Sequence, residues 1–151
     1  MTADPLGPLY RYVDRVDAGD LDAVGGLFVT DAVYDVLGTE AHGPEAIVGA
    51  LRRALSHWER TSHHATNPVV DPDGDGGARI SASVYAYHGR RDEVWHFWGR
   101  YTQDLVPRDD GWAIARMALI GIASDPPGDP ALFTGHPDRR PVTAPEERRS
   151  S

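Results

Sequence analysis

The hydrophobic period of this chain changes once, near residue 61, from the spacing of helices to the alternating spacing of strands. A single change of this kind predicts that helices and strands are segregated along the chain instead of alternating. Before it we predict helices at residues 4–19, 20–28 and 44–58, with one strand at 31–37. After it we predict four strands, at residues 62–70, 79–88, 93–106 and 112–122.

Local signals agree with this order of elements. Asp4-Pro5 and Gly43-Pro44-Glu45 are typical helix starts, because proline is favoured in the first turn, and Asp20 is placed to cap the second helix. Runs containing Gly and Asp at 73–77, 88–92 and 109–111 predict tight hairpin turns between the later strands. We therefore predict an α+β fold in which three N-terminal helices pack on one face of a curved, mainly antiparallel sheet.

Composition excludes several classes of chemistry. The 151 residues include no cysteine and no lysine, so disulfides, thiolate metal sites, cysteine nucleophiles and lysine Schiff bases are ruled out. A net charge of -8 argues against nucleic acid as a partner. No stretch of the chain is apolar over the length that a membrane helix needs, which predicts a cytoplasmic protein without a membrane partner.

Asp17 stands where the first helix is expected to be apolar. At helical spacing it shares a face with Leu6, Tyr10 and Val13, and a carboxylate on a buried face is costly unless it is paired. His63 is the partner that would make the pair useful, because a carboxylate fixes the tautomer of an imidazole and raises its basicity. The structural alternative makes Asp17 an exposed helix-end residue and His63 an ordinary strand residue.

The predicted strand at 93–106 carries rings on both faces, which is typical of a sheet covered on both sides. One face holds Trp95, Phe97 and Tyr101. The other face holds His96, Trp98 and Arg100. This second face, together with Tyr85 and Tyr87 of the preceding strand, is a candidate lining for a pocket that binds a polar aromatic ligand. Ordinary packing in a core or an interface is the alternative.

Two metal sites can be weighed from the sequence. The run at 71–76 matches the start of a calcium loop, but its twelfth position is Ala82, where a bidentate glutamate is required. His63, His88 and His96 could converge across a sheet, although no His-x-x-x-His pair lies on a helix. We predict a turn at 71–76, no metal and no cofactor.

The final stretch, residues 124–151, contains six prolines. We take residues 1–123 as one domain and 124–151 as a partly disordered tail. The start of this tail, through Leu132-Phe133, is expected to fold over the sheet, and disorder is expected beyond about residue 138.

Several runs of this chain together resemble one family of proteins: residues 12–22, 27–32 and 43–45, Gly99-Arg100-Tyr101-Thr102, and Gly111-Trp112. The family that they resemble is the SnoaL-like proteins of the nuclear-transport-factor-like superfamily. The resemblance covers about residues 8–122. It implies a conical α+β barrel that encloses a pocket, and this fold hosts dehydratases, cyclases, isomerases and inactive binders.

Two subgroups of this superfamily imply different sites. In scytalone dehydratase-like enzymes and lindane dehydrochlorinase an Asp near the end of the first helix pairs with a His on the strand after the third, which matches Asp17 and His63. The run from His63 to Asn67 is similar to the dehydrochlorinase strand, and the Arg that this enzyme uses in its last hairpin matches Arg108. Ketosteroid isomerase-like members instead use residues matching Tyr12 and Asp35. Their oxyanion-holding acid falls near Gly99 and is missing here.

The sequence thus predicts a cofactor-independent lyase, isomerase or cyclase of secondary metabolism that acts on a small cyclic or polyketide-like metabolite. His63 is the predicted general base and Asp17 its orienting partner, with Tyr12, Tyr34 or Arg100 holding the developing oxyanion. A non-catalytic binding or assembly domain and an isomerase based on Asp35 are the alternatives. A homodimer is expected, by family analogy and because Trp and Phe would otherwise be exposed.

Overall fold

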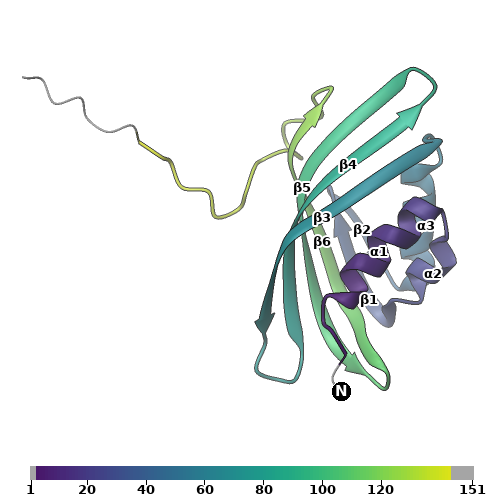
Figure 1. Ribbon diagram of the computed structural model, residues 1–151, viewed down its shortest axis with the longest axis vertical. Helices are drawn as coiled ribbons and strands as arrows, with labels where there is room; N and C mark the ends of the chain where they lie inside the picture. Colours follow the sequence, from purple (N-terminus) through teal and green to yellow (C-terminus); the bar gives the residue numbers. More distant parts are fainter. Residues whose placement is uncertain (1–2, 144–151) are drawn as a thin grey trace, which may run out of the picture.

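The computed structural model describes residues 3–143 of the chain. Within this part, three helices and six strands follow one another (Figure 1): α1 (Gly7–Ala18), α2 (Leu21–Gly25), β1 (Phe28–Val36), β2 (Thr39–His42), α3 (Pro44–Leu55), β3 (Arg60–Pro72), β4 (Ala78–Arg90), β5 (Glu93–Arg108) and β6 (Gly111–Asp125). The predicted α+β class and the predicted change from helices to strands near residue 61 are confirmed. No described helix is long and apolar enough to cross a membrane.

All the described strands form one sheet in the order β2-β1-β6-β5-β4-β3. Strand β1 runs parallel to β6, and every other neighbouring pair is antiparallel. The sheet curves strongly but stays open, and the helices lie together against its concave side (Figure 1). The sheet is not closed: α1 packs on β3 at one edge, and α3 packs on β1 and β2 at the other.

The first helix differs from the prediction in its start and its buried face. Asp4 accepts a hydrogen bond from the backbone of Leu6 at 2.9 Å, so it closes a turn ahead of α1. The buried stripe of α1 consists of Pro8, Leu9, Tyr12, Val13 and Val16. Tyr10 is exposed. Asp17 therefore lies beside the buried stripe, at the edge where α1 meets β3.

The segment after α1 folds with shorter elements than predicted. Asp20 caps α2 by accepting a hydrogen bond from the backbone of Ala23 at 3.3 Å, as expected, but α2 ends at Gly25. Phe28 begins β1 instead of ending a helix. The edge strand β2 was not predicted, because its four residues are too few to show an alternating pattern.

The start of the proline-rich stretch folds over the sheet, as predicted. Phe133 bridges to Gly121 of β6, and its ring packs edge-on against Phe97 with centroids 5.8 Å apart. Residues 136–143 then leave the sheet as an extended segment (Figure 1). The disorder expected beyond about residue 138 concerns mostly residues 144–151, which lie outside the described residues.

Candidate functional site

Asp17 and His63 meet where α1 crosses the start of β3. The carboxylate of Asp17 lies 2.6 Å from Nδ1 of His63 through Oδ1, and its Oδ2 accepts from the backbone N–H of His63 at 2.8 Å. Thr61 donates a third hydrogen bond to Oδ1 at 2.9 Å. Burial alone would raise the pKa of the Asp17 carboxyl, but the bonds from His63 and Thr61 hold this pKa below its usual value. Asp17 is therefore a carboxylate at neutral pH.

The imidazole of His63 is oriented by this contact. Its side chain is only 10% exposed, and the ring lines an internal cavity. Because Nδ1 faces the carboxylate, the neutral ring carries its proton on Nδ1 and leaves Nε2 with a lone pair. An imidazole in this state is equipped to accept a proton.

A second imidazole, His88 of β4, stands beside the first. The two ring centroids are 5.5 Å apart, with the planes nearly perpendicular. His88 is 6% exposed, and its Nδ1 has no hydrogen-bond partner among the described residues. Burial, followed by the nearby charge of His63, lowers the pKa of His88 from 6.5 to about 4. At neutral pH His88 is therefore uncharged.

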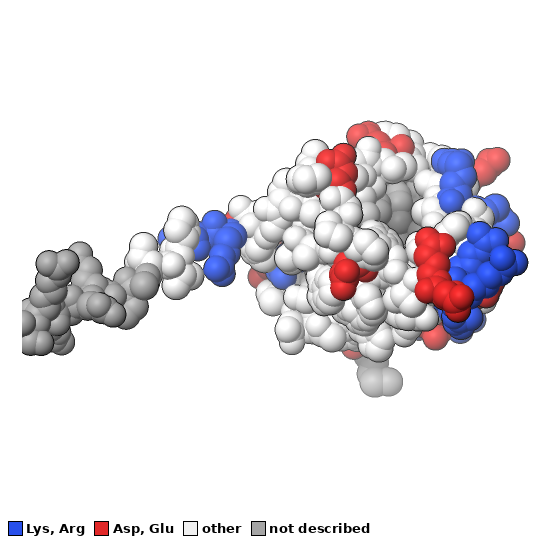
Figure 2. Space-filling view, turned by 90° about the horizontal axis from the view of Figure 1, so that it is seen from above, with Lys and Arg blue, Asp and Glu red and all other residues white. Residues whose placement is uncertain are grey.

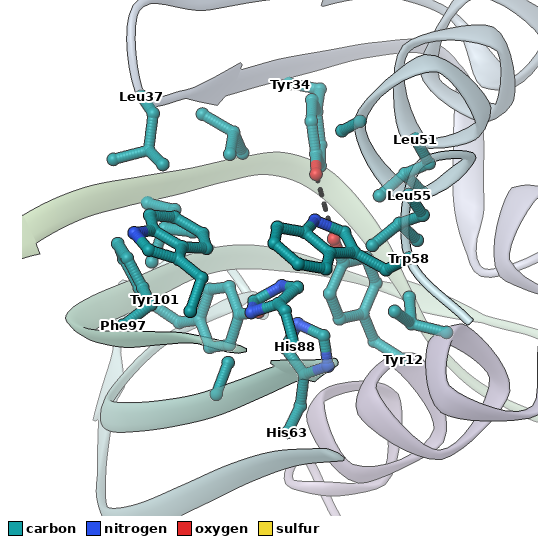
Figure 3. A pocket seen from close by; sticks show the side chains of 16 residues that line it. Tyr12, Tyr34, Leu37, Leu51, Leu55, Trp58, His63, His88, Phe97 and Tyr101 are labelled. Carbon is teal, nitrogen blue, oxygen red and sulfur yellow. Dashed lines mark hydrogen bonds between the residues drawn. The ribbon is translucent and has the colours of Figure 1, made fainter. Parts of the chain in front are cut away.

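Three buried tyrosines form the far wall of the same cavity. The hydroxyls of Tyr12 and Tyr34 lie 2.9 Å apart, and the ring of Tyr101 packs edge-on against Tyr12 (Figure 3). Burial raises the pKa of Tyr34 to about 12 and the pKa values of Tyr12 and Tyr101 well above the ordinary value. All three side chains are thus neutral phenols that can donate a hydrogen bond.

The cavity between α1, α3 and the inner face of the sheet has a volume of about 290 Å³. Most of its lining is aromatic or aliphatic, and no Asp, Glu, Lys or Arg of the described chain is part of it. The lining residues are Tyr12, Val16, Tyr34, Val36, Leu37, Leu51, Ala54, Leu55, Trp58, His63, Ala86, His88, Trp95, Phe97, Tyr101 and Leu119. Its polar atoms come from imidazole, phenol and indole groups, which favours a small ligand with few polar atoms.

Of the residues predicted from sequence, this cavity collects His63, Tyr12 and Tyr34, with Asp17 behind His63. Five others lie on the opposite face of the sheet: Tyr85, Tyr87, His96, Trp98 and Arg100. Side chains alternate along a strand, so the rings of Phe97 and Tyr101 that enter the cavity force their neighbours outward. On the outer face the hydroxyl of Tyr85 instead contacts Nδ1 of His96 at 2.7 Å.

The three remaining candidates are also outside the cavity. Asp35 faces outward from β1 and lies 3.4 Å from a guanidinium nitrogen of Arg116. Asn67 is exposed, with φ of 53° at a bulge of β3. Arg108 donates hydrogen bonds to the backbone carbonyls of Gly26 and Phe28. The carboxylate of Asp35 does not reach the cavity. It is therefore not placed to act as the base that the isomerase alternative requires.

Sequence reasoning missed five residues of the site: Trp58, His88, Trp95, Phe97 and Tyr101. An available signal was the alternating run Ile80, Ala82, Val84 and Ala86, whose next member on the same face is His88. The antiparallel register then places His88 opposite Trp95. The sequence prediction instead favoured the more polar face of each strand.

The described residues contain no group of three or more potential metal ligands. His63 and His88 do meet, but His96 points to the other face of the sheet. In the calcium-like run, Oδ1 of Asp73 accepts hydrogen bonds from the backbone N–H groups of Asp75 and Gly77, at 2.8 and 3.0 Å. This side chain closes the hairpin turn.

Comparison with known proteins places this geometry in context. The family model of the SnoaL-like domain matches residues 8–118. A protein from Novosphingobium aromaticivorans, provisionally named a scytalone dehydratase, is 20% identical over 95% of this chain and 91% of its own, with a TM-score of 0.70. No curated protein matches the chain in sequence.

Two further solved structures have the same fold. A provisionally named aromatic ring hydroxylase of Novosphingobium aromaticivorans is 26% identical over 74% of this chain and 82% of its own, with a TM-score of 0.68. A type 2 hexachlorocyclohexane dehydrochlorinase is 16% identical over 78% of this chain and 82% of its own, with a TM-score of 0.71. At these identities the similarity supports the fold, and the chemistry has to be argued from the site.

Proposed function

This chain belongs to the SnoaL-like family, and from that premise we propose that it is a lyase or isomerase that uses Asp17 and His63 as an acid–base pair on a small cyclic metabolite. The observation that carries the proposal is the 2.6 Å contact between Asp17 Oδ1 and His63 Nδ1 at the wall of an apolar cavity. A purely binding domain has no need of an oriented imidazole at this position. Solved structures of the same fold with dehydratase and dehydrochlorinase names are consistent with elimination chemistry.

The proposed reaction begins with proton removal. His63 Nε2 takes a proton from a carbon next to a carbonyl, and the resulting imidazolium is stabilised by the carboxylate of Asp17. Negative charge moves to the carbonyl oxygen. One of the two hydroxyls of Tyr12 and Tyr34 donates to the other, and the hydroxyl that accepts keeps its own proton free to donate to this oxygen. His63, Tyr12 and Tyr34 line one cavity, which supports placing the base and the oxyanion site together in this proposal.

Elimination then completes the reaction. The electron pair released at carbon forms a carbon–carbon double bond, the bond to a β-hydroxyl breaks, and the imidazolium of His63 returns its proton to the leaving oxygen as water. The base is regenerated and no other reactant is consumed. If the carbanion meets an internal electrophile instead, the same groups bring about ring closure.

The size of the cavity limits the substrate. A volume of about 290 Å³ is at the low end of ligand pockets, which are roughly 300–1,000 Å³. One ring or two fused rings fit this volume, whereas a longer polyketide would extend out of it. A bicyclic β-hydroxyketone such as 3-hydroxy-1-tetralone is a suitable probe, because its dehydration gives 1-naphthol, which is measured by fluorescence.

The test compares variants on this probe. Asp17→Asn and His63→Gln are expected to lower turnover by about 10² or more while circular dichroism stays unchanged. Asp35→Asn is the matched control, because it removes a carboxylate outside the cavity and is expected to retain full turnover. Wild-type turnover in both dyad variants would refute the proposal. Binding of the probe without conversion by the wild-type protein would support a non-catalytic binding domain.

We further propose that the protein is a homodimer that pairs through the outer face of the sheet. Trp98 is 40% exposed there, stacks with His96 and packs at a tilted angle against Tyr85, which forms an aromatic patch over β4 and β5. Large exposed aromatic patches are typical of protein interfaces. The outer face therefore serves assembly in this proposal, and the inner face serves chemistry.

A further inference from the structure

Trp58 occupies the boundary between the internal cavity and the outside. It follows the end of α3, and its ring lines the cavity together with two shallower surface grooves. Trp95 of β5 lines the cavity and one of these grooves. The two indole planes are 8° from parallel, with ring centroids 6.5 Å apart. Both indoles therefore stand between the cavity and this groove.

The segment that carries Trp58 is held on both sides. His57 Nε2 lies 2.8 Å from a carboxylate oxygen of Glu93, and the backbone N–H of Glu59 donates to the carbonyl of Gly89 at 3.0 Å. Both bonds reach the hairpin between β4 and β5, next to Trp95. The position of the first indole is thus fixed relative to the second before any ligand binds.

Aromatic contacts continue from this boundary to the acid–base pair. The ring of His88 lies 5.5 Å from Trp58 and 5.0 Å from Trp95, and His63 follows at 5.5 Å from His88 (Figure 3). Flat rings bind well to such a wall because offset-stacked and edge-to-face contacts add to the burial of apolar area. A puckered saturated ring of the same size makes only the apolar contacts.

Charged side chains are missing from the described lining of the cavity, although Glu93 lines the outer groove. Among the described residues that line the cavity there is no Arg or Lys to pair with a carboxylate or phosphate, and no Asp or Glu to pair with an ammonium group. Seen from above, the molecule is hollowed. Uncharged atoms and several acidic side chains surround the hollow, while arginine side chains gather toward the helices (Figure 2). Moving an ionised group into such a site without a partner is strongly unfavourable.

We propose that Trp58 and Trp95 are specificity-determining residues and that they select an uncharged molecule with a planar, unsaturated ring. The reaction that follows binding rests on the proposed function. The selective binding itself does not depend on it. The planar part of the substrate stacks against the two indoles, and the reacting carbon reaches His63 beyond them. The cavity thereby discriminates against saturated rings and against acids of equal size.

Binding of three inert probes by calorimetry tests the proposal: 1-naphthol, its saturated analogue decahydro-1-naphthol, and 1-naphthoate. The wild-type protein is expected to bind 1-naphthol about tenfold more tightly than the saturated alcohol, and 1-naphthoate at least about a hundredfold more weakly. Trp58→Leu and Trp95→Leu are each expected to weaken binding of 1-naphthol five- to tenfold and to leave the saturated alcohol within about twofold.

Three controls sharpen the experiment. Trp98→Leu makes the same exchange on the outer face and is expected to change neither affinity. Trp58→Phe keeps a ring and is expected to bind 1-naphthol within about threefold of wild type, which separates stacking from damage to the fold. Asp17→Asn changes a side chain that does not line the cavity, and it is expected to retain binding while turnover falls. Failure of the acid–base proposal and failure of this one are therefore distinguishable.

Several outcomes would overturn the inference. Equal losses for the flat and the saturated alcohol in Trp58→Leu would make this residue a structural one. Binding of 1-naphthoate as tight as that of 1-naphthol would refute the selection for uncharged ligands. Absence of measurable 1-naphthol binding by the wild-type protein would refute the selection for planar rings.

Discussion

His88 is expected to make the stability of this protein depend on pH between neutrality and pH 4. In the folded state the pKa of His88 is lowered to about 4, by burial and by the nearby charge of His63, whereas the ordinary value is 6.5. Below pH 6.5 the unfolded chain therefore binds a proton at this residue that the folded protein does not bind. Because protons then favour the unfolded state, the free energy of unfolding falls as the pH is lowered through this window.

The magnitude follows from the two pKa values. When His88 is fully protonated in the unfolded chain and still neutral in the folded protein, the free energy of unfolding is lower by at most about 3 kcal/mol. At pH 5 the same two values give about 2 kcal/mol, and above pH 7 they give almost nothing. His88 is 6% exposed, so little of this effect is lost to solvent screening. The neighbouring charges that act on it are those of His63 and Asp17.

Urea unfolding of the wild-type protein and of His88→Phe at pH 7.5 and pH 5 measures the effect. The wild-type protein is expected to lose about 2 kcal/mol more than the variant between the two pH values. In a His63→Gln background the difference is expected to shrink, because one cause of the lowered pKa of His88 is removed. Equal losses with and without His88, or a larger loss in the variant, would show that this imidazole is not buried in its neutral form.

Two further perturbations probe the hydrogen bond from Thr61 to Asp17 and the outer face of the sheet. Thr61→Val removes one of the three hydrogen bonds to Asp17 and is expected to lower the free energy of unfolding by about 1 kcal/mol in urea. Its turnover of 3-hydroxy-1-tetralone is expected to fall by less than tenfold. A hundredfold loss of turnover would make Thr61 as important as Asp17 and His63. Trp98→Glu places a charge in the outer aromatic patch and is expected to convert the dimer to a monomer, as measured by sedimentation. A wild-type protein that already sediments as a monomer would refute the proposed assembly.

The sequence was sufficient to predict the pairing of Asp17 with His63, although the argument from helical periodicity was imperfect. The predicted apolar stripe is not the buried one, and Asp17 lies beside the true stripe. The prediction still reached the right contact, because a carboxylate in the last turn of α1 and an imidazole at the start of β3 are joined wherever α1 packs on that edge strand. The family resemblance supplied this packing, which local pattern does not contain.

Strand faces were the harder problem. The alternation of side chains in β5 was read correctly, but periodicity does not say which face is concave. Polarity suggested that His96 and Arg100 face a ligand, whereas the helices cover the face that holds Phe97 and Tyr101. In a curved sheet the enclosed face is the one on which the helices pack, so the apolar face became the site and the mixed face the exterior. Arg108 was expected at the site from the family resemblance alone, but its guanidinium donates to the backbone carbonyls of Gly26 and Phe28.

The two imidazoles of the site differ in one respect that bears on the proposed chemistry. His63 has a carboxylate at 2.6 Å, and His88 has no hydrogen-bond partner for Nδ1 among the described residues. A proton taken from a substrate is therefore stabilised on His63 by Asp17, while His88 remains neutral and adds no repulsion to the new charge. If His88 were also paired with a carboxylate, two imidazolium ions would compete at 5.5 Å, and the first proton transfer would be opposed by the second charge. In the proposed mechanism, the apolar burial of His88 thus keeps the second ring uncharged while the carboxylate of Asp17 stabilises the charge on the first.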